Sequence, residues 1–100
     1  MEQKWDKQIL QLCAELLYKN FEQEAYEAIK KILPSINDML QTFARIALEQ
    51  PGGEENAKYV LQVMQEFLNA YQRRDNLALA DLMYYNLIEI ADVMTEQEIS

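Results

Sequence analysis

The side chains that most often perform covalent or acid–base catalysis are nearly absent from this sequence. It contains no histidine, one cysteine (Cys13) and only two serines, Ser35 and Ser100. Without histidine the commonest general base is missing, so neither a Ser-His-Asp nor a Cys-His arrangement can form. Cys13 lies within an apolar stripe, where a buried structural thiol is expected rather than a nucleophile. We therefore predict no catalytic residues and a protein that is not an enzyme.

Carboxylates are the remaining source of chemistry, because helical bundles can hold metal ions with inward-facing glutamates. Such sites also use Glu-x-x-His pairs, and this sequence has no histidine. No Asp-x-Asp-x-Asp-Gly calcium loop occurs, and two glutamates that would repel phosphate follow Gly52-Gly53 directly. We expect no metal and no cofactor, and a carboxylate-based metal-binding enzyme is the one enzymatic alternative. The glutamates predicted on polar helix faces are Glu15, Glu22, Glu24, Glu27 and Glu66.

The charge of the chain argues against several kinds of partner. Nine Lys and Arg stand against seventeen Asp and Glu, which gives a formal net charge of −8. Nucleic-acid binding depends on basic side chains, and anionic membranes repel an acidic chain, so we expect neither partner. We also expect no membrane span and no signal peptide, because no apolar run approaches about 18 residues and none follows the first charges. A single cysteine favours a reducing cytoplasm as the location.

Hydrophobic spacing predicts the elements that position these side chains. The chain has 100 residues, half of them apolar, with only two Gly and two Pro, which indicates one domain over residues 1–100. Apolar residues recur at steps of three and four, the period of an α-helix. The predicted helices span 2–18, 21–48, 56–73 and 76–95.

The second predicted helix contains a proline. Its apolar stripe runs from Ala25 to Ala47 and passes Pro34 without losing phase, because Pro34 falls on the polar side. A proline on the solvent side can kink a helix while the buried face stays continuous. We predict one kinked helix over 21–48, and two helices that break at Leu33 are the alternative.

Apolar stripes predict the buried faces of the other three helices. Each stripe follows the helical period, and its residues are expected in the core. The stripes are, in the first helix, Trp5, Ile9, Leu12 and Leu16, widened by Cys13 and Leu17; in the third, Ala57, Val60, Leu61, Met64, Leu68 and Tyr71; and in the fourth, Leu77, Ala80, Tyr84, Leu87, Ala91 and Met94.

The fourth predicted helix has more apolar surface than one core requires. A second stripe that includes Leu79 and Met83 lies beside the first, and Leu82, Tyr85 and Ile88 lie further round the helix. Exposed apolar ridges mark partner or oligomer surfaces, where tyrosine is enriched. We therefore identify Leu82, Tyr85 and Ile88 as candidate partner-binding residues. The alternative is that Tyr85 lies flat on the surface with its hydroxyl in water.

Two stretches of the sequence are similar to each other. Tyr18 through Phe21 leads towards Ala25, and Tyr71 through Asn76 leads towards Ala80, so a repeat would place the two alanines at equivalent helix crossings. Chance similarity between two amphipathic hairpins is the alternative. Two hairpins joined by the Pro-Gly-Gly loop at 51–53 predict an all-α fold, an antiparallel four-helix bundle with a long, Pro-kinked second helix.

Parts of the chain also resemble a known family. The relevant stretches are Gly52-Gly53-Glu54, Ala57-Lys58, Phe67-Leu68 and Arg73-Arg74-Asp75, preceded by Ile36-x-Asp38-Met39-Leu40. Together they resemble bacterial flagellin export chaperones, small helical bundles that wrap an unfolded flagellin tail. The family's Tyr-rich N-terminal arm is missing, and Asp75 to Leu87 is equally similar to other small bacterial helical-bundle proteins. The resemblance implies a helical bundle with a partner-binding role and transfers no binding residues.

The missing catalytic groups and the surplus apolar surface together predict a non-enzymatic protein-interaction module. It would act as a chaperone or adaptor that holds an amphipathic helix of a partner. The alternative is a homo-oligomeric structural bundle, with a symmetric homodimer formed through the helix at 76–95. Asp81, Glu89 and Asp92 flank the apolar ridge and oppose self-pairing, although salt screens part of this repulsion.

Overall fold

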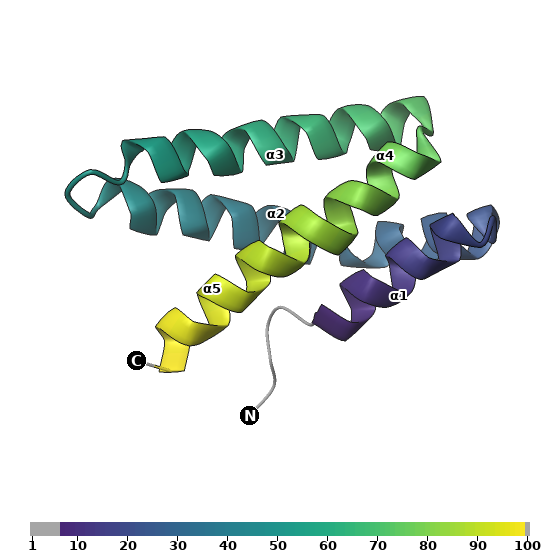
Figure 1. The fold of residues 1–100 in the computed structure, drawn as a ribbon, viewed down its shortest axis with the longest axis horizontal. Helices are drawn as coiled ribbons and strands as arrows, with labels where there is room; N and C mark the ends of the chain where they lie inside the picture. The colour runs from purple at the N-terminus through teal and green to yellow at the C-terminus, as the bar shows by residue number, and fades with distance from the viewer. Residues whose placement is uncertain (1–6, 100) are drawn as a thin grey trace.

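The computed structural model describes the backbone of residues 7–99 and the side chains of residues 7–93, and its ordered elements are all helical (Figure 1). The elements are α1 (Lys7–Tyr18), α2 (Glu22–Leu48), α3 (Glu54–Arg73), α4 (Asn76–Asp81), the π-helical stretch η1 (Leu82–Leu87) and α5 (Ile88–Ile99). The last three follow one another without a break, so the described chain forms four helices and contains no strand. This confirms the predicted all-α class.

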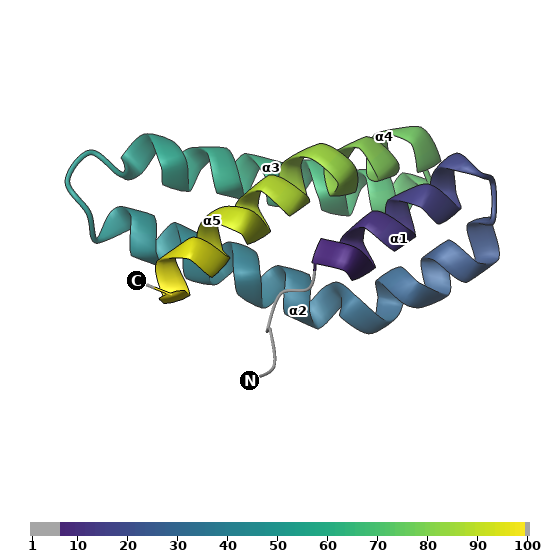
Figure 2. The same cartoon turned by 60° about the horizontal axis from the view of Figure 1, so that its bottom comes forward.

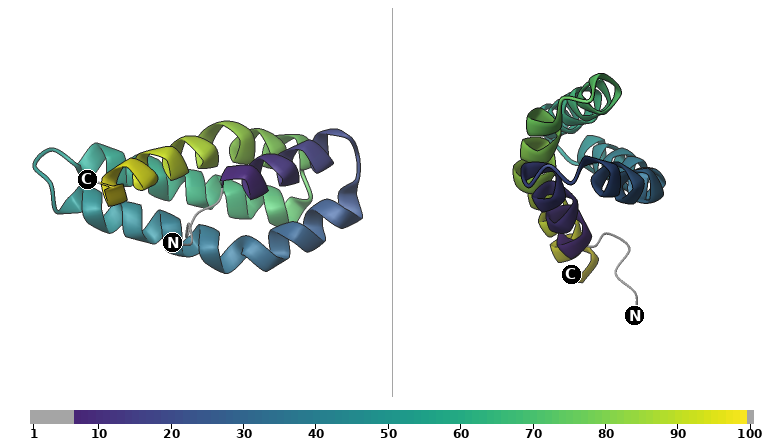
Figure 3. Two further views of the ribbon diagram at one scale, coloured as in Figure 1. Left: turned by 90° about the horizontal axis from the view of Figure 1, so that it is seen from below. Right: turned by 90° about the vertical axis from the view of Figure 1, so that its right-hand side faces the viewer.

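The helices lie in two layers (Figures 2 and 3). In one layer α2 and α3 run side by side, and in the other α1 lies beside α4, η1 and α5. The Cα trace measures 42 × 31 × 19 Å, and its shortest dimension fits two layers of helices packed about 8–10 Å apart. Each layer therefore has an outer face that points away from the other layer.

The turn between α2 and α3 depends on its glycines. Gly52 has a positive φ of 75°, a conformation that side chains with a Cβ rarely adopt. At Gly53, a Cβ atom would lie 1.7 Å from the carbonyl oxygen of Ala47, so the close approach of the chain to the end of α2 requires glycine.

The proline lies within α2, which is a single helix from Glu22 to Leu48. Pro34 is exposed, whereas Ile36, Met39 and Leu40 after it are buried. Because the ring lies on the solvent side, the buried face continues past the hydrogen bond that proline cannot make. The alternative of two helices that break at Leu33 is wrong.

The turns that end α1 and α3 have the same backbone geometry. Asn20 and Arg74 each adopt a left-handed conformation, with φ of 66° and 56°. Each turn then closes with the pair of hydrogen bonds of a Schellman motif. The N–H groups donate from Phe21 to Leu16 at 2.8 Å and from Asn20 to Leu17 at 3.1 Å, and likewise from Asp75 to Ala70 at 2.9 Å and from Arg74 to Tyr71 at 3.3 Å.

This match corrects the alignment of the sequence repeat. Asn20 and Arg74 are equivalent, so corresponding residues differ by 74 − 20 = 54 positions. Ala25 then corresponds to Leu79 and not to Ala80, although all three are fully buried. The similarity that the sequence suggests is real for the turns, and it is shifted by one residue in the helices that follow.

Two of the predicted stripes are rotated relative to the observed core. Ile9 and Leu12 of α1, and Leu61 and Leu68 of α3, are exposed rather than buried. Both helices have more apolar positions than one face can bury, so packing against neighbours selects the face. Trp5 lies outside the described residues. The buried residues are Leu10, Cys13, Ala14 and Leu17 in α1, and Ala57, Val60, Val63, Phe67 and Ala70 in α3.

The fourth helix also differs from its predicted stripe. Leu77 is 65% exposed and Tyr84 is 38% exposed, so neither belongs to the core. The helix turns mainly its second predicted stripe inward, together with part of the first. Among its described side chains, which end at residue 93, the buried ones are Leu79, Ala80, Met83, Leu87, Ile90 and Ala91. Met94 of the predicted stripe lies outside the described side chains.

Candidate interaction surface

The π-helical stretch η1 explains which residues of the fourth helix face the core. Leu79, Met83, Leu87 and Ala91 are all fully buried, at intervals of four residues. In an α-helix with 3.6 residues per turn, each step of four rotates the side chain by about 40° away from its starting direction. A π turn closes with i→i+5 hydrogen bonds and takes more residues, so it offsets part of this rotation. The π-helical stretch thus keeps the four residues on one face.

The same stretch turns two consecutive tyrosines outward. Tyr84 and Tyr85 are 38% and 63% exposed, and their ring centroids lie 5.1 Å apart in an edge-to-face contact. Tyr18, at the end of α1, is 41% exposed, and its ring lies 6.4 Å from that of Tyr84. We call Tyr18, Tyr84 and Tyr85 the tyrosine surface. π-Helical turns are uncommon and are often found at functional sites.

The three residues selected from the sequence occupy different environments. Tyr85 is the most exposed member of the tyrosine surface, whereas Leu82 and Ile88 are half-buried and pack against the core. The sequence pattern does not identify Tyr18 or Tyr84 as partner-binding residues. Tyr18 comes from another helix, and Tyr84 lies on the stripe assigned to the core. The Tyr84-Tyr85 pair is the signal for this surface, because two consecutive helical residues diverge by about 100°, and two large rings fit into one buried seam only with difficulty.

Polar contacts fix α1 against the fourth helix beside this surface. The Tyr18 hydroxyl donates a hydrogen bond to Asp81, and Lys7 at the other end of α1 forms an ion pair with Asp92. Partial desolvation of the ring against its neighbours, followed by the hydrogen bond to Asp81, raises the pKa of Tyr18 from 10.0 to about 12. The hydroxyl therefore stays protonated at neutral pH and acts as a donor. The two contacts hold the tyrosine rings of separate helices together.

A further hydrogen bond connects η1 to α3. The Asn86 side-chain amide donates to the Tyr59 hydroxyl at 2.9 Å. Together with the bond from Tyr18 to Asp81, it links the last helix to both of its neighbours near the tyrosine surface. The helix that bears Tyr84 and Tyr85 is therefore held from both sides, by α1 and by α3.

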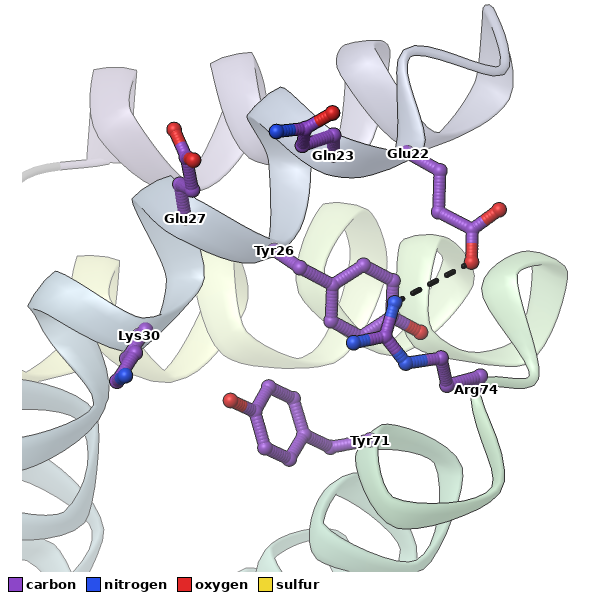
Figure 4. A pocket seen from close by; sticks show the side chains of 7 residues that line it. All are labelled: Glu22, Gln23, Tyr26, Glu27, Lys30, Tyr71 and Arg74. Carbon is purple, nitrogen blue, oxygen red and sulfur yellow. Dashed lines mark hydrogen bonds and ion pairs between the residues drawn. The ribbon is translucent and has the colours of Figure 1, made fainter.

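Away from the tyrosine surface, a hollow lies between the start of α2 and the end of α3 (Figure 4). It has a volume of about 500 Å³ and is lined by Glu22, Gln23, Tyr26, Glu27, Lys30, Tyr71 and Arg74. The Arg74 guanidinium lies 4.3 Å from the centroid of the Tyr26 ring and 3.4 Å from a Glu22 carboxylate oxygen. The Tyr26 hydroxyl donates to the Asn76 side chain at 2.7 Å. These contacts balance the charge of Arg74 and hold the α3–α4 turn against α2. The residues that line the hollow therefore have a structural role.

The other candidates for chemistry behave as buried or dispersed groups. Cys13 is fully buried, and burial raises the pKa of its thiol from 9.0 to about 11, so the thiol is not a reactive nucleophile at neutral pH. Within residues 7–93, no three His, Cys, Asp or Glu side chains gather where they could hold a metal ion. None of the helices in the described part of the chain combines the length and the apolar character needed to cross a membrane.

Comparison with known proteins yields no match: no family model, no curated protein and no solved structure is similar to this chain. The function must therefore be argued from the surfaces of the molecule. Fold and site together define a small all-helical protein with an aromatic ridge on one face.

Proposed function

We propose that this chain is a non-enzymatic protein-interaction module whose tyrosine surface holds an amphipathic helix of a partner protein. The observation that carries the proposal is the outward position of Tyr84 and Tyr85 on the π-helical stretch, with Tyr18 beside them. Tyrosine offers a large apolar ring with a polar tip, and it is enriched at the centres of protein interfaces. Leu82 and Ile88 are half-buried, and each lies three residues from Tyr85, about one helical turn away. Their exposed parts add apolar surface.

The charges around the tyrosine surface favour a partner with basic flanks over a second copy. Asp81, Glu89 and Asp92 are exposed along the same helix, and Lys7 balances the charge of Asp92, so Asp81 and Glu89 give this side its acidic character. Symmetric pairing of two copies through this helix would bring these carboxylates together. A partner helix with Lys or Arg beside its apolar stripe would instead meet opposite charge. The apolar stripe of such a helix would lie on the tyrosine rings.

The proposal includes a finer description of the fold and its setting. We take the four helices as an antiparallel bundle with a kink at Pro34, which gives the tyrosine surface a rigid base. The resemblance to flagellin export chaperones supports a role in holding a helical segment of another bacterial protein. The buried free thiol of Cys13 is compatible with a reducing cytoplasm.

The test compares three forms of the full chain: wild type, Tyr85→Glu and Leu68→Glu. Leu68 is the matched control, because it is an exposed apolar residue of the opposite layer and receives the same charge. Each form is used to capture proteins from a bacterial lysate, and a peptide of the captured segment is then titrated by calorimetry. We expect Tyr85→Glu to weaken peptide binding by about tenfold or more, as for a central interface tyrosine, and Leu68→Glu to leave it unchanged. Capture of no stoichiometric partner, or equal binding by wild type and Tyr85→Glu, would contradict the proposal.

A further inference from the structure

One row of side chains runs along the outermost line of the fourth helix. The π-helical stretch keeps Leu79, Met83 and Leu87 in line on the buried side. The residues two positions after each of them are turned by about 200° from the core, so they form a second line on the opposite side of the helix. We call this second line the outer row, and it consists of three exposed residues, Asp81, Tyr85 and Glu89.

Elsewhere in the molecule, an arginine already occupies the same combination of residues. Glu22 and Tyr26 lie four positions apart on α2, which is also the spacing between the tyrosine and each acidic residue of the outer row. The Arg74 guanidinium lies 4.3 Å from the centroid of the Tyr26 ring and 3.4 Å from a Glu22 carboxylate oxygen (Figure 4). A planar guanidinium can stack on a ring while its N–H groups donate to a carboxylate. A carboxylate and a tyrosine one helical turn apart therefore form a site for arginine in this fold.

The two sites differ in where an arginine can come from. Tyr26 is 7% exposed and its guanidinium belongs to the same chain, whereas Tyr85 is 63% exposed. No Lys or Arg occurs from residue 75 to residue 100, and the three arginines of the chain belong to α2, α3 and the turn that follows α3. Lys7 of α1 is held by Asp92. An arginine on the outer row would therefore come from another molecule.

The charges that α1 adds beside the outer row do not offset its acidic character. Glu15 precedes Tyr18 by three positions, so the two lie on the same side of α1. The N–H of Lys19 still bonds to the Glu15 carbonyl as in a helix, so the Lys19 side chain is turned by about 100° from that of Tyr18. The tyrosine surface is thus bordered by carboxylates on both helices, which favours a cationic group.

We propose that the outer row binds an arginine side chain of the partner helix. This inference rests on the proposed function and names the residue that the partner supplies. The guanidinium stacks on the exposed Tyr85 ring and donates to Asp81, while Glu89 adds negative charge on the other side. The Tyr18 hydroxyl donates to one oxygen of Asp81, which holds this carboxylate in place and leaves its second oxygen as an acceptor. The apolar stripe of the partner lies beside the arginine, on Tyr84 and Tyr18.

Arginine fits this site better than lysine. The ammonium group of lysine is a compact and strongly hydrated charge, whereas a guanidinium is more weakly hydrated and lies flat on a ring. Cation–π contacts in proteins accordingly involve arginine more often than lysine. The partner helix is therefore expected to have an arginine at the edge of its apolar stripe, and lysine at that position is expected to bind less tightly.

The test uses the full chain and two synthetic peptides. Each peptide has about 18 residues, enough for an alanine-based sequence to form an isolated helix. Both contain the same leucine stripe, and the one residue at its edge is arginine in the first peptide and lysine in the second. Fluorescence anisotropy measures the binding of each labelled peptide. The wild type is expected to bind the arginine peptide about threefold or more tightly than the lysine peptide.

Two variants test the two parts of the site. Asp81→Asn/Glu89→Gln removes both carboxylates and is expected to weaken binding of the arginine peptide by about fivefold. Tyr85→Leu keeps an apolar side chain and removes the ring, so it is expected to abolish the preference for arginine over lysine. Glu27→Gln/Glu55→Gln is the matched control, because it removes two exposed carboxylates from the other layer and is expected to leave binding unchanged.

The outcomes separate this inference from the proposed function. Equal affinity of the wild type for both peptides overturns the arginine site, and so does a preference that Tyr85→Leu retains. An effect of Asp81→Asn/Glu89→Gln no larger than that of the control overturns it as well. If Tyr85→Glu still weakens both peptides in these cases, the proposed function stands without the arginine site. Binding of neither peptide also overturns the arginine site, and capture from the lysate then decides the proposed function separately. Circular dichroism verifies that each variant keeps its helix content.

Discussion

Replacing Arg74 with alanine and with glycine separates the contribution of its side chain from that of its backbone. The residue has a φ of 56°, a region in which an L residue with a Cβ is strained and glycine is not. Its guanidinium also contacts the Tyr26 ring at 4.3 Å and Glu22 at 3.4 Å. Alanine removes these contacts and keeps the strain, whereas glycine removes both.

The expected magnitudes follow from these contacts. A cation–π contact contributes about 0.5–1 kcal/mol at an exposed site, and an exposed ion pair about 0.2–1 kcal/mol. Arg74→Ala should therefore lower the free energy of unfolding by about 1–2 kcal/mol. Glycine relieves about 1–2 kcal/mol of strain in the left-handed conformation. It also lowers the free energy of unfolding by about 0.4–1 kcal/mol, because it increases the conformational entropy of the unfolded chain. Arg74→Gly should thus be about 0.5–1 kcal/mol more stable than Arg74→Ala.

The assay is urea unfolding followed by circular dichroism, with the free energy of unfolding extrapolated linearly to zero denaturant. Asn20 is the internal comparison, because it has the same turn geometry and Asn tolerates the left-handed region better than other residues with a Cβ. Asn20→Gly should therefore change stability less than the difference between the two Arg74 variants. This account of the turn would be refuted if Arg74→Ala were as stable as the wild type. It would also be refuted if Arg74→Gly were no more stable than Arg74→Ala.

Two further predictions concern the core and the Tyr18 hydroxyl. Phe67→Ala removes a fully buried ring and should lower the free energy of unfolding by about 3–5 kcal/mol. Leu77→Ala, at an exposed site, should change the free energy of unfolding by less than about 0.5 kcal/mol. Equal effects of the two substitutions in urea unfolding would contradict the assigned core. The pKa of Tyr18 is raised from 10.0 in the unfolded chain to about 12 in the folded chain, so its stabilising contribution is complete below pH 10 and is lost as pH rises towards 12. Tyr18→Phe should remove this part of the pH dependence. The difference between the ultraviolet titrations of wild type and variant isolates Tyr18, and an ordinary tyrosine pKa in that difference would contradict the prediction.

The helix boundaries could be predicted from the sequence because their signals are local. The predicted helix at 21–48 corresponds to α2 (Glu22–Leu48), and that at 56–73 to α3 (Glu54–Arg73). Pro34 does not interrupt the predicted helix, because the apolar stripe places it on the polar side. These features depend on residues a few positions apart, which the sequence displays directly.

The orientation of the helices could not be predicted in the same way. α3 has apolar residues on neighbouring sides, and contacts with α2 and α4 bury Val63 and Phe67 while Leu61 and Leu68 stay outside. The π-helical stretch carries no capping or proline signal in the sequence. Its trace in the sequence is the four-residue spacing of Leu79, Met83 and Leu87, which deviates from the helical period by less than one residue per turn. Tyr85 could be predicted as a surface residue because the fourth helix has more large apolar side chains than one face can bury.

The thinness of the molecule has a consequence for its stability. With only two layers of helices, spanning 19 Å between Cα extremes, each layer keeps an outer side in contact with solvent (Figure 3). The buried side chains form one cluster between the layers, so the whole fold depends on this single seam. A ligand or protein that covered an outer side of the folded chain would stabilise it by mass action, because the unfolded chain offers no such side.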